Sequence, residues 1–252
     1  MKIDLTGKTV LVTGASRGIG KSLAEGLAGS GATVAAHFNR SREEAESLVR
    51  SLGNDSRAFQ ADLAEPAACE RLFHDVEEAF GRVDVLVNNA GVAIRIAPDS
   101  DTDTWLADWR LTMSVNLRAV EQLSRLAIRH FQEHDGGRII NIASRAAFRG
   151  DTPEYMTYAA SKGGVVALTR SIARGYGKAG ICAFVVAPGF VRTDMAQEAI
   201  DEYGEEFVTR DLALNRLTEP ADLTPLVVLL ASGLADHATG TSIDVNAGSY
   251  VR

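Results

Sequence analysis

The chain has 252 residues, of which 46% are hydrophobic, and it carries a formal net charge of −7 at pH 7. This apolar content is typical of a globular protein and excludes a disordered one, while an acidic chain without runs of Lys and Arg lacks the electrostatic signature of a nucleic-acid or membrane-surface binder. The amino-terminal residues lack the apolar region of a signal peptide and no apolar run reaches membrane-spanning length, so we expect a cytoplasmic protein.

Short β-branched segments alternate along the chain with longer segments of helical periodicity, which indicates repeated β-α-β units. Strands are expected at 9–14, 32–38, 56–62, 83–91, 138–144, 181–189 and 242–248. Helices are expected at 18–30, 42–52, 66–80, 103–132, 155–177 and 221–232. The strands are almost wholly apolar, as in a sheet that helices cover on both faces. The expected fold class is α/β: residues 1–252 form a single domain with a Rossmann-type, doubly wound parallel sheet of about seven strands.

The first expected strand runs into a glycine-rich turn that opens the first helix, Thr13-Gly14-Ala15-Ser16-Arg17-Gly18-Ile19-Gly20. Glycines at such a turn let the backbone approach a pyrophosphate closely, and the start of the helix presents unpaired N–H groups to the anion. Because a strand precedes the turn and a helix follows it within a β-α-β unit, the turn predicts dinucleotide binding rather than an ordinary loop.

The spacing of Gly14, Gly18 and Gly20 resembles the glycine turn of the short-chain dehydrogenase/reductase family. Further motifs of that family follow in the same order: Asp62-Leu63, Asn88-Asn89-Ala90-Gly91, Asn116, Ser144, Tyr158 with Lys162, and Pro188-Gly189. The chain is similar in particular to 3-oxoacyl-thioester (acyl carrier protein) reductases and to glucose and gluconate dehydrogenases of the family. The resemblance implies an oxidoreductase that transfers hydride between a nicotinamide and a carbonyl or secondary alcohol.

The resemblance implies the catalytic residues Asn116, Ser144, Tyr158 and Lys162. Tyr158 and Lys162 lie four residues apart, so a helix places them on one face. There the ammonium group and a bound nicotinamide favour the phenolate of a general acid/base. We expect Ser144 to hydrogen-bond the substrate oxygen, Lys162 to bond the nicotinamide ribose as well, and Asn116 to hold a water that links Lys162 to solvent.

The expected cofactor contacts follow the glycine turn and the ends of later strands. They are Gly14, Ser16, Arg17, Gly18, Ile19, Gly20, Asn39, Arg40, Ser41, Asp62, Leu63, Asn89, Ala90, Gly91, Tyr158, Lys162, Pro188, Gly189, Val191 and Thr193. The second strand ends without the Asp or Glu that binds the ribose hydroxyls of NAD, whereas Arg40 and Arg17 can bind a 2′-phosphate. NADP(H) is therefore the expected cofactor, and NAD(H) remains possible if both arginines are only solvated.

Several side chains near Ser144 and Tyr158 in the sequence are candidates for a substrate pocket: Arg95, Arg145, Phe148 and Tyr155. Arg145, with Arg149 and Arg192, can hold a carboxylate or phosphate of the substrate, or can pair with the acidic residues of the segment after the sixth strand. That segment, at about 193–216, is long for a connection and is expected to form a helical lid over the substrate.

A 3-oxoacyl thioester is the preferred substrate, and a sugar or polyol is the alternative within the family. An isomerase or dehydratase on the same scaffold and a noncatalytic NADP-binding sensor are alternatives of other classes. Wide apolar faces on the helices of Asn116 and Tyr158 indicate, by the resemblance, a homotetramer. Cys69 and Cys182 have no Cys or His at metal-ligand spacing, so neither a metal site nor a disulfide is expected.

Overall fold

Seven parallel strands form one sheet in the order β3-β2-β1-β4-β5-β6-β7 in the computed structural model, which describes residues 3–193, 196–197, 200–201, 204, 206 and 209–251. The strands are β1 (Thr9–Val12), β2 (Thr33–Phe38), β3 (Arg57–Gln60), β4 (Val85–Asn88), β5 (Gly137–Ile142), β6 (Ile181–Pro188) and β7 (Ser242–Val245). The strand order reverses between β1 and β4, which is where open α/β sheets bind ligands. The expected Rossmann-type, doubly wound parallel sheet is confirmed.

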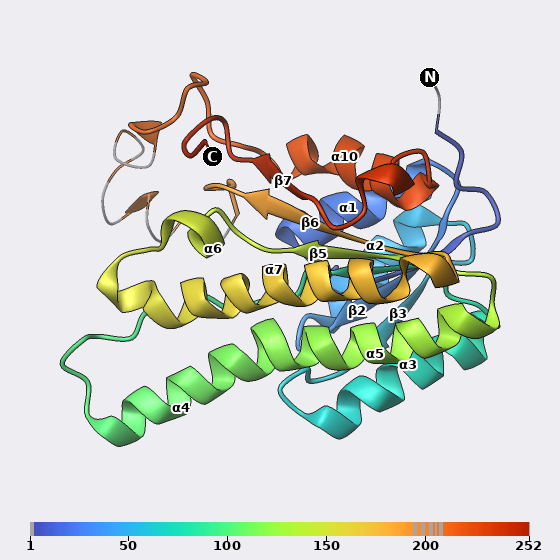
Figure 1. The fold of residues 1–252 in the computed structure, drawn as a ribbon, viewed down its shortest axis with the longest axis horizontal. Helices are drawn as coiled ribbons and strands as arrows, with labels where there is room; N and C mark the ends of the chain where they lie inside the picture. The colour runs from blue at the N-terminus through green and yellow to red at the C-terminus, as the bar shows by residue number, and fades with distance from the viewer. Residues whose placement is uncertain are drawn as a thin grey trace.

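Helices cover both faces of this sheet (Figure 1). They are α1 (Gly18–Gly29), α2 (Arg42–Leu52), α3 (Pro66–Phe80), α4 (Thr102–Met113), α5 (Ala119–Glu133), the short α6 (Ala146–Arg149), α7 (Met156–Tyr176) and α10 (Pro220–Ser232). Side chains of α1, α2 and α10 share one core with Val10 and Val12, and side chains of α3, α5 and α7 share another with Leu11. Successive strand residues therefore face opposite cores, which explains why the strands are apolar throughout.

Local sequence signals fix several helix boundaries. Asp101 caps α4, because its Oδ1 accepts hydrogen bonds from the backbone N–H groups of the next turn. Pro66 and Pro220 occupy the first turns of α3 and α10, where a missing N–H costs no helical hydrogen bond. Gly81 ends α3 in the left-handed conformation, with φ of 72°.

The single helix expected at 103–132 is interrupted by a π-helical turn, η1 (Ser114–Arg118), between α4 and α5. Asn116 in this turn is fully buried, and its carboxamide exchanges two 2.8 Å hydrogen bonds with the backbone of Val92. A π turn contains an extra residue and so rotates the helix that follows it. The hydrophobic period does not report such a local rotation, so the expectation of one continuous helix was wrong.

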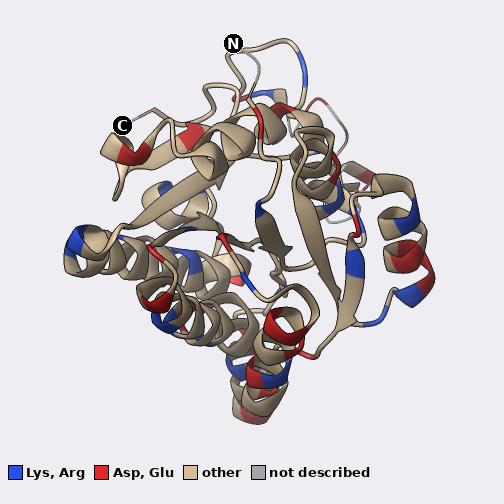
Figure 2. Ribbon diagram, turned by 90° about the vertical axis from the view of Figure 1, so that its right-hand side faces the viewer, with Lys and Arg blue, Asp and Glu red and all other residues tan. Residues whose placement is uncertain are grey.

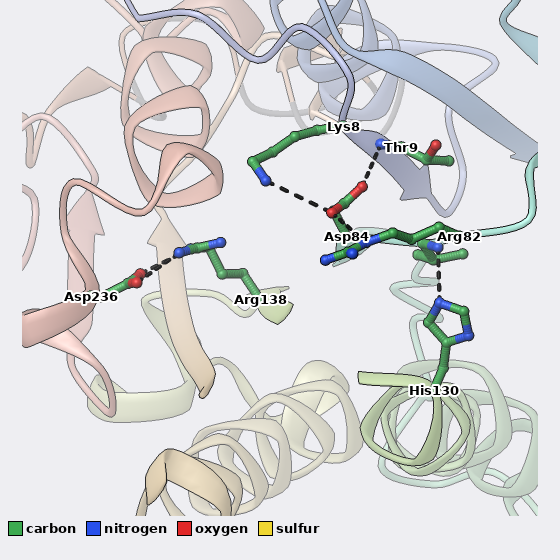
Figure 3. Close-up of polar contacts among 8 residues, drawn as sticks. Lys8, Thr9, Arg82, Asp84, His130, Arg138 and Asp236 are labelled. Carbon is green, nitrogen blue, oxygen red and sulfur yellow. Dashed lines mark hydrogen bonds and ion pairs between the residues drawn. The ribbon is translucent and has the colours of Figure 1, made fainter. Parts of the chain in front are cut away.

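Charged side chains join the strand starts at the amino end of the sheet (Figure 3). Asp84 accepts hydrogen bonds from the backbone N–H of Thr9 and from Nε of Arg82, both at 2.9 Å. Arg138 on β5 forms a two-pronged pair with Asp236, at 2.9 and 2.7 Å. These contacts stabilise the end of the sheet that lies opposite the expected site.

The segment expected to form a lid, 193–216, lies partly outside the described residues. The residues that flank it contact each other, and its second half contacts the residues after β7. Val191 pairs with Thr218 in an isolated parallel bridge, and the N–H of Ala213 donates to the carbonyl of Ala247 at 2.8 Å. The ends of the segment therefore lie at the carboxyl end of the sheet, and its helical form stays a prediction.

Lys, Arg, Asp and Glu of both signs are spread along the helices rather than gathered by sign in the view of Figure 2. A helix that crosses a bilayer needs about 20 mostly apolar residues. Within the described ranges, every helix is too short or too polar for such a crossing.

Candidate active site

The turn between β1 and α1 has the backbone shape of a phosphate cradle. Gly14 and Gly18 have φ of +66° and +53°, in the left-handed region that side chains disfavour. A Cβ on Gly20 would lie 2.1 Å from the carbonyl oxygen of Gly14, so this position has room only for glycine. Among the described residues no side chain caps the start of α1, so its first N–H groups remain for an anion. The turn therefore fits the pyrophosphate of a dinucleotide.

Thr13 and Asn89 fasten this turn to the loop after β4. The Thr13 hydroxyl accepts from the N–H groups of Asn89 and Ala90, at 2.9 and 3.0 Å. The Asn89 side chain donates to the carbonyl oxygens of Thr13 and Gly14, at 2.9 and 3.2 Å. Thr13 was not among the expected site residues, and a hydroxyl residue directly before the glycine turn was the only sequence signal for it.

His37, at the end of β2, connects the same turn to the loop after β3. Its Nδ1 accepts from the N–H of Gly14 and its Nε2 donates to the carbonyl of Ala61, each at 3.0 Å. The side chain is 2% exposed, and burial lowers the pKa of His37 to about 4. The ring is therefore neutral near pH 7, as both bonds require. Sequence analysis missed this residue, whose signal was a histidine within an apolar strand.

The side chains expected around a 2′-phosphate come from the glycine turn and from the residues after β2. Arg17, Asn39 and Arg40 are exposed, and Ser41 is half-buried. The neighbouring Arg42 donates from its Nη2 to Gln60 at 2.7 Å. The binding of a phosphate by Arg40 and Arg17 stays a prediction.

Asp62 and Leu63 follow β3, where the adenine contact was expected. The Asp62 carboxylate is exposed and accepts from the N–H of Ala64 at 2.9 Å, so it also stabilises its own loop. Leu63 is 5% exposed and packs in the core that α3 and α5 cover, so any contact it makes with an adenine ring uses its backbone.

The four expected catalytic side chains converge from three elements. Ser144, just after β5, hydrogen-bonds the hydroxyl of Tyr158 on α7. Nζ of Lys162 lies 5.9 Å from the centre of the Tyr158 ring and donates to the carbonyl of Ile142 at 2.9 Å. A Cβ on Gly91 would lie 3.3 Å both from that Nζ and from the carboxamide oxygen of Asn116 in η1. The loop after β4 therefore reaches the same centre.

Burial controls the electrostatics of this centre. It raises the pKa of the Tyr158 phenol, and the hydrogen bond with Ser144 acts in the opposite direction. It also lowers the pKa of Lys162 to about 8. The expected support of the phenolate by Lys162 and a bound nicotinamide stays a prediction, because the raised pKa describes the protein without cofactor.

Asn116 is held in place by two neighbouring segments. Its carboxamide oxygen accepts from Val92, while its nitrogen donates to the carbonyl of Val92 and to the hydroxyl of Ser161 at 3.1 Å. An amide oxygen can accept a second hydrogen bond. The expected water that links Lys162 to solvent therefore stays a prediction.

The residues expected near the nicotinamide follow β6. The carbonyl of Pro188 accepts from the N–H of Arg145 at 2.8 Å, and the N–H of Gly189 donates to Val245 at 3.1 Å. The hydroxyl of Thr193 donates to the carbonyl of Val191 at 3.2 Å, and its methyl group would lie 3.3 Å from a Cβ on Gly18. The segment after β6 therefore meets the glycine turn across the end of the sheet.

The candidate pocket residues occupy two adjacent loops. The N–H of Ile96, next to the exposed Arg95, donates to the carbonyl of Glu154, next to the half-buried Tyr155, at 3.0 Å. Phe148 on α6 is also half-buried. By contrast Arg145 is only 7% exposed, and its guanidinium carbon lies 4.8 Å from the centre of the Phe190 ring.

The fold and this geometry define a Rossmann-type oxidoreductase. The family model of the short chain dehydrogenases matches residues 8–204, and the chain belongs to that family. Members of this family are enzymes that act on a carbonyl or alcohol with a nicotinamide cofactor. This agrees with the expectation from the sequence.

Relatives and solved structures match almost the whole chain. The 3-oxoacyl-[acyl-carrier-protein] reductase of Staphylococcus aureus is 37% identical over 97% of this chain and 98% of its own. A dehydrogenase/reductase from Sinorhizobium meliloti, 36% identical, superposes with a TM-score of 0.92 over 99% of this chain and 98% of its own. A putative NAD(P) dependent gluconate 5-dehydrogenase from Beutenbergia cavernae with bound NADP is 34% identical, with a TM-score of 0.90 over 99% of both chains.

Proposed function

We propose that this enzyme reduces the ketone of a 3-oxoacyl thioester with NADPH. The observation that carries the proposal is the hydrogen bond between Ser144 and Tyr158 beside Lys162, at the carboxyl end of the sheet. The likeness to the Staphylococcus aureus 3-oxoacyl-[acyl-carrier-protein] reductase over nearly the full length supports a thioester as the substrate.

The chemistry divides between the cofactor and the protein. A bound reduced nicotinamide supplies the hydride for the carbonyl carbon. Tyr158 donates its phenolic proton to the carbonyl oxygen, which becomes the hydroxyl of the alcohol. Ser144 hydrogen-bonds the same oxygen and stabilises the negative charge that develops on it. The raised pKa of Tyr158 suits reduction of the carbonyl, because the phenol then holds at neutral pH the proton that it must donate.

Lys162 and Asn116 support Tyr158. After Tyr158 has given its proton, the ammonium group of Lys162 stabilises the phenolate until solvent restores the proton. The remaining N–H groups of Lys162 are free to bond the nicotinamide ribose while one holds the carbonyl of Ile142. The Asn116 side chain hydrogen-bonds Val92 and Ser161, and so holds η1 against the segments that surround Lys162.

We infer a preference for NADP(H) over NAD(H). The residues after β2, Asn39, Arg40 and Ser41, include no acid to repel a 2′-phosphate, and Arg40 is exposed. The bound NADP of the Beutenbergia cavernae structure supports the same preference. We expect kcat/KM to be higher for NADPH than for NADH, and Arg40→Asp to reverse that order. An unchanged order in Arg40→Asp would contradict the role of Arg40.

A sugar or polyol dehydrogenase is the second candidate, favoured by the likeness to a putative gluconate 5-dehydrogenase. A noncatalytic NADP sensor would bind the cofactor and show no turnover. We therefore test NADPH oxidation with the N-acetylcysteamine thioester of 3-oxobutanoate, for the native protein and for Tyr158→Phe. We expect turnover by the native protein and a loss of about a hundredfold or more in Tyr158→Phe. No turnover would overturn the thioester assignment, and gluconate and polyols with NADP⁺ would then be assayed.

We also propose that the chain assembles as a homotetramer through α4 and α5. Trp105, Trp109 and Leu111 on α4 are 42%, 38% and 42% exposed. A hollow of about 390 Å³ lies beside them, lined by Trp109, Arg110, Met113, Ser114, Leu117, Arg118 and Glu121. Large apolar side chains around a hollow are typical of a protein interface. Light scattering should give four times the chain mass, and Trp109→Glu should lower it; a monomer mass for the native protein would contradict the proposal.

We infer that residues 193–216 act as a substrate lid within a single domain. The bridge between Val191 and Thr218 and the bond from Ala213 to Ala247 support this inference, because they hold the segment at the carboxyl end of the sheet. Proteolysis within 193–216 should slow when NADP⁺ and a ketone are both present, and an unchanged rate would argue against a lid.

A cytoplasmic location is consistent with Cys69 and Cys182, which are both free thiols.

A further inference from the structure

Arg145 is a buried arginine whose Nη1 lacks a hydrogen-bond partner among the described residues. The residue follows Ser144 directly, and its side chain is 7% exposed. Its Nη1 is shielded from solvent and has no hydrogen-bond partner among the described residues. Burying an unpaired guanidinium is costly, so a residue that serves only the fold would be expected to have a carboxylate or carbonyl oxygen there.

The other arginines near the site have different surroundings. Arg192 forms an ion pair with Glu219 at 3.0 Å. Arg149, the last residue of the short helix α6 that Arg145 precedes, is exposed to solvent. Arg145 is thus distinguished from both by burial without an ion pair.

The surroundings of Arg145 hold its guanidinium group by one face. The Phe190 ring lies 4.8 Å from the guanidinium carbon, so a cation–π contact fixes the side chain. A guanidinium group that stacks on a ring still presents its N–H edge, which matches the two oxygens of a carboxylate. The backbone N–H of Arg145 donates to the carbonyl of Pro188, the last residue of β6. This bond fixes the backbone from which the Arg145 side chain extends.

The charges around Arg145 are of both signs. Burial and the nearby Arg149 lower the pKa of Arg145, whereas Asp151 and Asp211 act in the opposite direction. Neither aspartate forms a hydrogen bond with the Nη1 group. Both are exposed and stand on the two segments that border the site, the loop before α7 and the segment before α10. Their charges lower the free-energy cost of burying the Arg145 guanidinium group, but they do not supply a hydrogen bond to its Nη1.

We propose that Arg145 is the anchor for a carboxylate carried by the substrate, within a few bonds of the ketone that Ser144 and Tyr158 engage. The inference rests on the proposed carbonyl reductase function and specifies its substrate class as carboxylate-bearing ketones. A 3-oxoacyl chain that ends in a carboxylate and a keto acid of a sugar both belong to this class. Pairing of Arg145 with the acidic segment 193–216 is the competing outcome.

The test compares a carboxylate with its neutral ester at the same position. The probes are the N-acetylcysteamine thioester of 3-oxohexanedioic acid and the methyl ester of that thioester. Calorimetry measures the Kd of each probe for the native protein saturated with NADP⁺, so no turnover occurs. The variants are Arg145→Met, Arg145→Lys, which keeps the charge but loses the fork, and Arg149→Met as the matched control on α6.

We expect the acid to bind the native protein at least about tenfold more tightly than the ester. This advantage should vanish in Arg145→Met, fall to an intermediate value in Arg145→Lys and persist in Arg149→Met. Equal Kd values for acid and ester in the native protein would overturn the inference, as would an acid preference that survives in Arg145→Met. The first outcome would be expected if Arg145 pairs within the protein, and the second would mean that another group binds the carboxylate.

NADPH oxidation with the methyl ester separates this inference from the proposed function. Turnover of the ester without any preference for the acid would overturn the anchor and leave the thioester reductase standing. A preference for the acid in binding without turnover of either probe would overturn the thioester assignment and leave the carboxylate anchor standing.

Discussion

The ammonium nitrogen of Lys162 lies 5.9 Å from the centre of the Tyr158 ring, one helical turn along α7. Burial raises the pKa of the Tyr158 phenol, and the hydrogen bond with Ser144 acts in the opposite direction. The same burial lowers the pKa of Lys162 to about 8. In the protein without cofactor the pair therefore favours a protonated Tyr158, which is the form that can donate a proton to a ketone.

Carbonyl reduction should lose rate as the pH rises above about 8. A lowered pKa means that Lys162 is charged below about pH 8 and neutral above it, where it can no longer support the phenolate. We expect kcat/KM for the ketone to fall about tenfold per pH unit beyond that value. Steady-state rates from about pH 6 to about pH 10 test this. Lys162→Arg should move the decline to higher pH, and a flat native profile up to pH 10 would contradict the assignment.

Protonation of His37 should destabilise the fold in mild acid. Its folded pKa of about 4 lies below the ordinary value of 6.5, so the unfolded chain binds the proton first as the pH falls. Stability is therefore fully present above pH 6.5 and is lost progressively down to pH 4, by up to about 3 kcal/mol. The bond from Gly14 breaks when Nδ1 takes the proton.

Urea unfolding at several pH values between 7 and 4 measures this loss. His37→Gln should show a smaller decrease between pH 6.5 and 4 than the native protein. His74→Gln alters an exposed histidine on α3 and serves as the control. Equal slopes in all three proteins would show that His37 is not the group responsible.

Two glycines of α1 should respond oppositely to alanine. A Cβ on Gly20 would meet the Gly14 carbonyl at 2.1 Å, whereas a Cβ on Gly29 would have no other atom within 4 Å. Gly20→Ala should displace the turn and weaken NADPH binding by about tenfold or more. Gly29→Ala should keep NADPH affinity and stabilise the helix by about 0.5 kcal/mol. Fluorescence titration and thermal unfolding measure both, and native NADPH affinity in Gly20→Ala would exclude the proposed cradle.

The sequence predicted most of the fold because its strands and helices have distinct periods and its turns carry strong signals. The glycine turn is an example, since the conformation and the close approach at Gly20 both require glycine. Contacts between distant segments were not predictable. The hydrogen bond from Gly14 to His37 spans 23 positions, and the Asn116 side chain is held by a hydrogen bond from Val92. The burial that raises the pKa of Tyr158 was not predictable either, because local spacing does not report desolvation.

Arg145 should contribute to binding at the expense of stability. Desolvating its unpaired charge costs several kcal/mol, whereas the cation–π contact with Phe190 returns about 1 kcal/mol. Arg145→Met keeps the length of the side chain and removes the charge, so we expect it to raise the free energy of unfolding by about 1 kcal/mol. Arg149→Met, at an exposed position, should change it by less than about 0.5 kcal/mol. Chemical denaturation of both variants decides the sign. A loss of stability in Arg145→Met would mean that the guanidinium group has a structural partner, whereas a gain would leave the bound carboxylate as the reason for an arginine at this position.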